Sequence, residues 1–141
     1  MAALFSLADD DEVGTGRRTR SRKVNAVRIT VGDDRVVCDR CELAESTLAR
    51  MRGLLGRDGL EPGHGMLIQG AGSIQMFFMR FPIDVVFLGR DKAIVGIAHD
   101  VKPWRAAAAR RARAALELPA GTAKSLDLQI GDVLTFAPVH E

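Results

Sequence analysis

At residues 79–88 the chain reads Met79-Arg80-Phe81-Pro82-Ile83-Asp84-Val85-Val86-Phe87-Leu88. The β-branched and aromatic residues after Pro82 predict a buried strand, yet Asp84 lies in the middle of them. A buried carboxylate is costly unless it is paired or well hydrogen-bonded. The fold must therefore supply a partner for Asp84, and Arg80, just across Pro82, is the nearest candidate.

A second block repeats this device. Leu116-Glu117-Leu118-Pro119-Ala120-Gly121 places one acid inside another apolar strand. Arg80, Asp84 and Glu117 together have two interpretations. They could line a pocket that orients a polar ligand or performs acid–base chemistry, if burial raises the pKa of one carboxyl. Alternatively, they could form a buried ion-pair network that sets the register of the strands.

Two further residues belong to the candidate pocket. Arg50 has the guanidinium geometry that binds a phosphate or a carboxylate through two hydrogen bonds. It could equally pair with Asp84 or Glu117 and close the fold. Met79 stands beside Arg80 and would supply an apolar wall. The predicted ligand-binding residues are thus Arg50, Met79, Arg80, Asp84 and Glu117.

The rest of the chain predicts short strands and one main helix. The helix begins at Ser46 as N-cap and ends at Gly56, and a single helical turn is expected in residues 106–109. Residues 74–79 are apolar on both faces apart from Gln75, so they are expected in the interior of a closed or well-covered sheet. Strands are expected at 25–31, 35–37, 66–69, 74–80, 83–88, 93–98, 114–118 and 133–136. The pattern predicts a β-dominated α+β fold, a small barrel-like or sandwich sheet with one main helix.

Length and charge limit the class of protein. A chain of 141 residues corresponds to one domain, and a net charge of +2 gives little reason to expect nucleic acid. Residues 1–23 lack apolar periodicity and predict a disordered basic leader, which leaves 24–141 as a single β-rich domain. No apolar stretch approaches the ~18 residues of a transmembrane helix. The N-terminus does not resemble a signal peptide, so a cytoplasmic location is expected.

Cysteines and basic residues offer weaker candidate sites. Cys38 and Cys41 form a C-x-x-C pair, but no second cysteine pair completes a zinc site. If the strand continued through them, their side chains would face opposite sides, which favours ordinary thiols over a metal or redox centre. We predict no metal and no cofactor. Trp104 and the arginines of 105–113 form a basic aromatic run that could contact nucleic acid, although a solvated loop is the simpler interpretation.

Four motifs in order carry a family resemblance. They are Arg50-x-x-Gly53-Leu54-Leu55-x-Arg57, Phe78-Met79-Arg80-x-Pro82-Ile83-Asp84-x-x-Phe87, the 116–121 block and Gly131-Asp132. Over residues 35–137 the chain resembles the domain-of-unknown-function 192 family, also called uncharacterised protein family 0127. The resemblance implies a compact, mostly β single domain and no established activity. Related sequences often carry a Cys and a His before the Met-Arg block, whereas this chain has neither in residues 70–75.

The function expected from the sequence is a small-ligand-binding or accessory domain whose ligand is small and polar. One alternative is a hydrolase that uses Asp84 and Glu117 as an acid–base pair. Another is a nucleic-acid accessory protein that binds through residues 17–23 and 105–113. Nucleic acid is not an expected partner, and no membrane-spanning segment is expected. The sequence does not indicate the oligomeric state.

Overall fold

The computed structural model describes residues 26–44 and 57–139 of the chain. Its elements are β1 (Ala26–Val31), β2 (Arg35–Ala44), β3 (His64–Gln69), β4 (Ser73–Gln75), β5 (Ile83–Leu88), η1 (Arg90–Lys92), β6 (Ile94–Val101), β7 (Ala106–Ala108), β8 (Ala114–Pro119), α3 (Thr122–Ser125) and β9 (Leu134–Pro138). This confirms the β-dominated α+β fold. The helix expected between Ser46 and Gly56, and Arg50 with it, lies outside the described residues.

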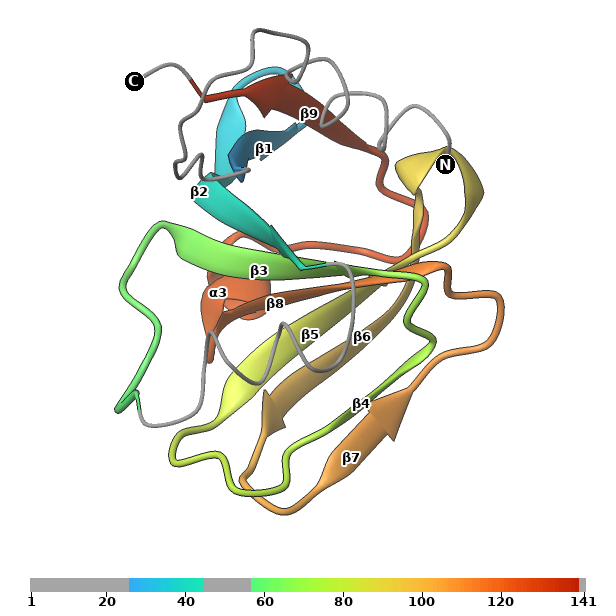
Figure 1. Cartoon of the computed structure of the whole chain (residues 1–141). Helices are drawn as coiled ribbons and strands as arrows, with labels where there is room; N and C mark the ends of the chain where they lie inside the picture. The colour runs from blue at the N-terminus through green and yellow to red at the C-terminus, as the bar shows by residue number, and fades with distance from the viewer. Residues whose placement is uncertain (1–25, 45–56, 140–141) are drawn as a thin grey trace, which may run out of the picture.

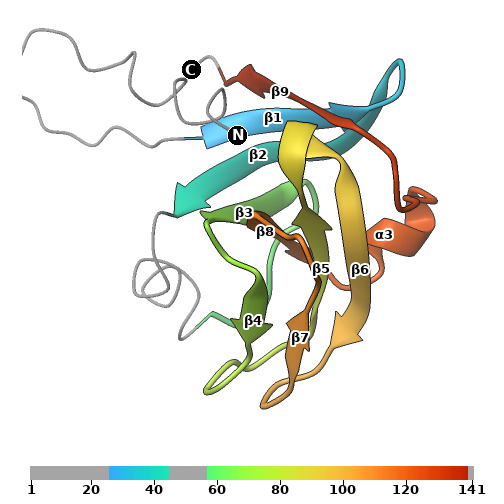
Figure 2. The ribbon, with the colours of Figure 1, turned by 90° about the vertical axis from the view of Figure 1, so that its right-hand side faces the viewer.

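Seven strands form one curled sheet in the order β6-β5-β8-β3-β2-β1-β9 (Figures 1 and 2). The sheet is mixed, because β2 and β3 run parallel whereas the other neighbours are antiparallel. It curls as a barrel does but stays open, with β6 and β9 as its edge strands. Next to these edges, an isolated bridge joins Ala93 to Val133, and the N–H of Ile94 donates to the carbonyl of Asp132. The barrel-like, β-dominated sheet expected from the sequence is confirmed, and within the described residues it does not close into a complete barrel.

Two hydrophobic cores lie on the two faces of this sheet. One core joins β1, β2 and β9 to one face of β5 and β8, and it includes Ile29, Leu116 and Leu134. The other lies under the two-stranded sheet of β4 and β7. Strand β5 is covered on both faces, and all six of its residues are buried. This double coverage explains why residues 83–88 read as a continuous apolar run rather than an alternating one.

Two segments differ from the sequence prediction. Residues 74–80 were expected as one buried strand, but β4 ends at Gln75 and leaves Phe77 and Phe78 exposed. Residues 106–109 were expected to make a helical turn, but Ala106–Ala108 is a strand that pairs antiparallel with β4. Alanine has a high helix propensity but little else to specify its state, so the open edge of β4 decides the outcome. Among the described residues, no helix has the length and apolar character needed to cross a bilayer.

Candidate functional site

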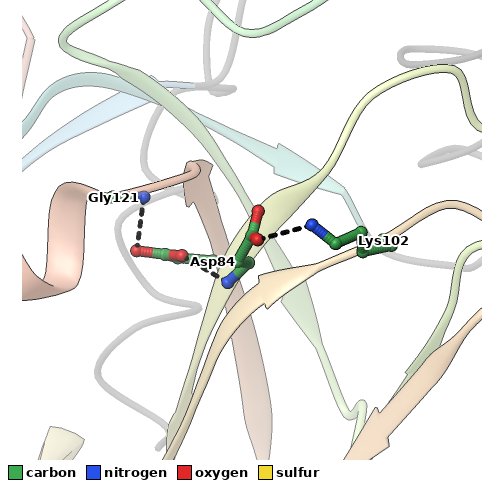
Figure 3. Close-up of polar contacts among 4 residues, drawn as sticks. Asp84, Lys102 and Gly121 are labelled. Carbon is green, nitrogen blue, oxygen red and sulfur yellow. Dashed lines mark hydrogen bonds and ion pairs between the residues drawn. The ribbon is translucent and has the colours of Figure 1, made fainter.

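The Asp84 carboxylate lies at the junction of β5, β6 and α3 and has no exposed area. Its Oδ1 accepts a hydrogen bond from the backbone N–H of Asp100 at 2.8 Å. Its Oδ2 accepts a second hydrogen bond from the N–H of Gly121 at 3.0 Å (Figure 3). The same oxygen accepts a third from the N–H of Ala123 at 2.9 Å. Three backbone amides thus supply the stabilisation that a buried carboxylate requires. Asp84 fastens β5 to its neighbour β6 and to the start of α3.

Local backbone geometry aims those amides at Asp84. Ile83 pairs with Val101 and Val85 pairs with Ala98, so β6 carries an extra residue opposite Asp84. Asp100 lies in this bulge with a left-handed φ of 52°. On the other side, Gly121 has a φ of 95°, which favours glycine. The acid of the first sequence block therefore binds the glycine that ends the second.

Arg80 does not pair with Asp84. Its guanidinium is exposed and lies 3.3 Å from Oδ1 of Asp58, whose side chain is 92% exposed. The pairing suggested by the sequence is wrong, because the chain around Arg80 is a loop and the backbone already satisfies Asp84. Met79, next to Arg80, is buried in the core beneath β4 and β7.

The two acids of the candidate pocket lie on opposite faces of the sheet. Asp84 pairs with Leu118, whereas Glu117 pairs with Val85. Directly paired residues share a face and successive residues alternate, so Asp84 and Glu117 point apart. Both have no exposed area. The structure therefore does not bring them together, and an acid–base pair facing a common substrate is not formed by these side chains.

Cys38 and Cys41 are both buried and point into the same core. Ile29 pairs with Cys38 and Val27 with Cys41, so β2 has a bulge between the cysteines. The expectation that they face opposite sides is wrong, because the bulge adds a residue and restores the inward direction. Burial, together with a hydrogen bond that the Cys41 thiol donates to the Cys38 side chain, raises the pKa of Cys41 well above its usual range. Within the described residues, no group of three or more His, Cys, Asp or Glu is placed to hold a metal ion.

We expect the thiols to be inert in the folded protein. Because the pKa of Cys41 is raised, its thiolate is scarce at a pH where an exposed cysteine, with a pKa of about 8.5, already reacts. Iodoacetamide at mildly alkaline pH should modify Cys41 only as fast as the protein unfolds.

The thiol of Cys41 ionises at a lower pH in the unfolded protein than in the native one, so the free energy of unfolding should fall as pH rises above about 8.5. Melting curves of the wild type and Cys41→Ala across that range test this, and equal pH slopes would contradict it.

Three exposed aromatic side chains form what we call the ring cluster: Phe77, Phe78 and Trp104. Their exposed fractions are 48%, 63% and 59%, respectively. The ring centroid of Trp104 lies 5.9 Å from that of Phe77 and 4.9 Å from that of Phe78, the latter in an edge-to-face arrangement. The rings come from the β4–β5 and β6–β7 connections, which lie at the same end of the molecule (Figures 1 and 2).

The backbone holds the ring cluster in place. The N–H of Trp104 and the N–H of Met79 both donate to the carbonyl of Met76, and the N–H of Met76 donates to the carbonyl of Arg105. Phe78 and Trp104 have left-handed φ values of 65° and 70°. This conformation costs a non-glycine residue about 1–2 kcal/mol, and such strain concentrates at functional sites. The ring cluster is a fixed feature that the fold maintains against a local cost.

Sequence reasoning treated these three residues as core or as a solvated loop. The signal it missed is the position of two phenylalanines just before the Met-Arg-x-Pro turn, where a strand must end. The contact between Phe78 and Trp104 spans residues far apart in the sequence and follows only from the pairing of β4 with β7. A separate hollow of about 360 Å³ lies between β6 and α3, and its lining includes His99, Lys124 and Asp127 but none of the predicted pocket residues.

Two known proteins are similar to this chain in sequence. A UPF0127 protein of Pyrococcus abyssi is 31% identical over 98 residues, which cover 64% of this chain and 80% of that protein. A UPF0127 protein of Thermococcus kodakarensis is 29% identical over 107 residues, which cover 71% of this chain and 66% of the relative.

Two crystal structures are also similar. A protein of unknown function from Novosphingobium aromaticivorans matches with a TM-score of 0.67 and 26% identity, covering 79% of this chain and 84% of that one. A Sinorhizobium meliloti protein, proposed to be a transcription regulator, matches with a TM-score of 0.69 and 30% identity, covering 84% of this chain and 98% of that one. The family model described as "Uncharacterized ACR, COG1430" matches residues 27–136. The resemblance inferred from the four motifs is confirmed, and the chain belongs to the DUF192 family.

Proposed function

We propose that this chain is a non-catalytic binding domain and that the ring cluster is its binding surface. The observation that carries the proposal is the exposure of three contacting rings on two loops whose backbones are hydrogen-bonded together. Exposed aromatic clusters of this kind mark interaction sites, because water-exposed apolar area is stabilised by covering it. Phenylalanine and tryptophan also supply large contact areas with few rotatable bonds, which limits the entropy lost on binding.

The carboxylates support a binding role over the hydrolase alternative. Both carboxylate oxygens of Asp84 accept hydrogen bonds from backbone amides, and Glu117 lies buried on the other face of the sheet. A substrate would reach neither group without opening the core. The small polar ligand expected from the sequence stays a prediction. Asp84 and Glu117 lie on opposite faces of the sheet, and Arg80 lies on an exposed loop. Arg50 lies outside the described residues.

Site-specific photocross-linking in cells of the organism that naturally produces the protein tests the proposal. The photoreactive residue p-benzoylphenylalanine, incorporated in place of Phe78, should form a discrete adduct on illumination, because whatever covers the ring cluster lies against it. Adding Trp104→Ala to that protein should abolish the adduct, since the surface loses its largest exposed ring.

Arg90 provides the matched control position. It is exposed in the β5–β6 turn, at the opposite end of the molecule from the ring cluster (Figure 2). The photoreactive residue placed there should give no such adduct. An unmodified chain at position 78, or the same adducts at both positions, would show that the ring cluster is not the binding surface.

A further inference from the structure

We propose that the ring cluster docks the protein onto a lipid bilayer that carries anionic headgroups, with the three rings inserted among the headgroups and upper acyl chains. This inference rests on the proposed function and names the partner of the same surface. Tryptophan and phenylalanine favour that interfacial depth, because their rings are apolar while the surroundings stay partly hydrated. The argument has three parts: the shape of the surface, its area and its flanking charge.

The ring cluster lies on two loops at one end of the molecule. Phe77 and Phe78 come from the connection that follows β4, and Trp104 comes from the one that precedes β7. Both connections lie at one end of the molecule, beyond the ends of β5 and β6 (Figures 1 and 2). Exposed rings at one end of a molecule can enter a bilayer interface without requiring a cavity on the partner.

The exposed area suits shallow insertion. At 48%, 63% and 59% exposure the three side chains present roughly 350 Å² in total, taking about 200 Å² for each whole aromatic side chain. A stable protein–protein interface covers about 800 Å² on each partner. The ring cluster by itself is too small for that, whereas a bilayer needs only the apolar tip and charges around it.

Cations flank the rings. Arg80 and Lys102 are exposed on the same two loops, where Arg80 pairs with Asp58 and Lys102 pairs with Asp100. Arg105, also exposed, follows Trp104 directly and places a third positive charge on these two loops. Basic residues next to an inserted tip are attracted by an anionic leaflet, which strengthens binding about fivefold for each charge.

Proteins that bind single-stranded nucleic acid also combine basic and aromatic side chains. The arrangement of the three rings nevertheless favours lipid as the partner. Bases bind by stacking on open ring faces. Here Phe78 packs edge-to-face with Trp104, so the rings cover one another and present a compact apolar tip instead of separate platforms. The remaining arginines of the basic run, Arg110, Arg111 and Arg113, lie beyond the far end of β7 from the rings.

The experiment uses the full chain and vesicles of phosphatidylcholine, with or without about one third phosphatidylglycerol. Trp104 is the single tryptophan and the chain has no tyrosine, so its fluorescence reports on the ring cluster directly. With anionic vesicles the Trp104 emission should shift to shorter wavelength, and the protein should sediment with them. Phosphatidylcholine alone should bind at least about fivefold more weakly, and added salt should weaken the anionic case.

Two variants test the residues. Phe78→Gly should lower vesicle binding about tenfold, since it removes the most exposed ring. Its fold should survive, because glycine accepts the left-handed backbone there. Arg105→Glu should lower binding to anionic vesicles at least about fivefold. The matched controls are Ile130→Ser, which removes a 68% exposed apolar side chain elsewhere, and Arg90→Glu at the opposite end, and both should bind as the wild type does.

Three results would overturn the inference: no emission shift with anionic vesicles, equal binding by Phe78→Gly, or a shift with a single-stranded oligonucleotide in place of vesicles. A protein adduct at position 78 together with no vesicle binding would reject the bilayer and keep the ring cluster as a binding surface. If neither an adduct at position 78 nor binding to vesicles were observed, the proposed function would be rejected as well.

Discussion

Asp84→Asn should lower the free energy of unfolding by about 3–5 kcal/mol. The wild-type carboxylate accepts three backbone hydrogen bonds inside the core. An amide of the same shape has one acceptor oxygen, so its NH₂ group must face at least one of the N–H donors of Asp100, Gly121 and Ala123. Charge-assisted hydrogen bonds are lost, and a buried donor is left without an acceptor.

Urea denaturation of Asp84→Asn beside Asp100→Asn measures this effect. Asp100 serves Asp84 through its backbone amide, which the substitution retains, and asparagine accepts the left-handed φ of 52° at that position. The control loses its exposed ion pair with Lys102, which is worth at most about 1 kcal/mol. If both variants unfolded at the same urea concentration as the wild type, Asp84 would not hold the three elements together.

Gly65→Ala should destabilise the protein by about 3 kcal/mol, because β3 has no room for a side chain at this position. A Cβ on Gly65 would lie 2.8 Å from the backbone carbonyl oxygen of Glu117 and 3.1 Å from Sγ of Cys38. The first contact is with the backbone of β8, the neighbouring strand, so relief requires the sheet to shift rather than a side chain to rotate.

Gly59→Ala is the matched control for this change. A Cβ there meets no atom of the described residues within 4 Å, so the stability of the variant should stay within about 0.5 kcal/mol of the wild type. Thermal melting of the two variants, with the wild type, compares them directly. A melting temperature for Gly65→Ala equal to that of Gly59→Ala would show that β3 and β8 can separate at little cost.

The described part of the site shows how far local sequence can lead. The need for a partner at Asp84 followed from one acid in an apolar strand, and that need is real. The identity of the partner was wrong, because Arg80 is near in sequence while the amides of Asp100, Gly121 and Ala123 approach only through the bulge in β6 and the turn before α3. The residues around a buried acid do not indicate which distant backbone N–H groups will donate hydrogen bonds to it.

The sequence by itself determined the family, the β-dominated class and most strands, because β-branched runs and turn residues act over short distances. Tertiary structure decided three things: which amides meet Asp84, which way Cys38 and Cys41 point, and that Phe77, Phe78 and Trp104 gather on the surface. Each depends on pairing between strands far apart in the chain, such as β4 with β7, or on one bulged residue that reverses a side chain's direction. Register between strands is a property of the assembled sheet, and a single strand's pattern does not contain it.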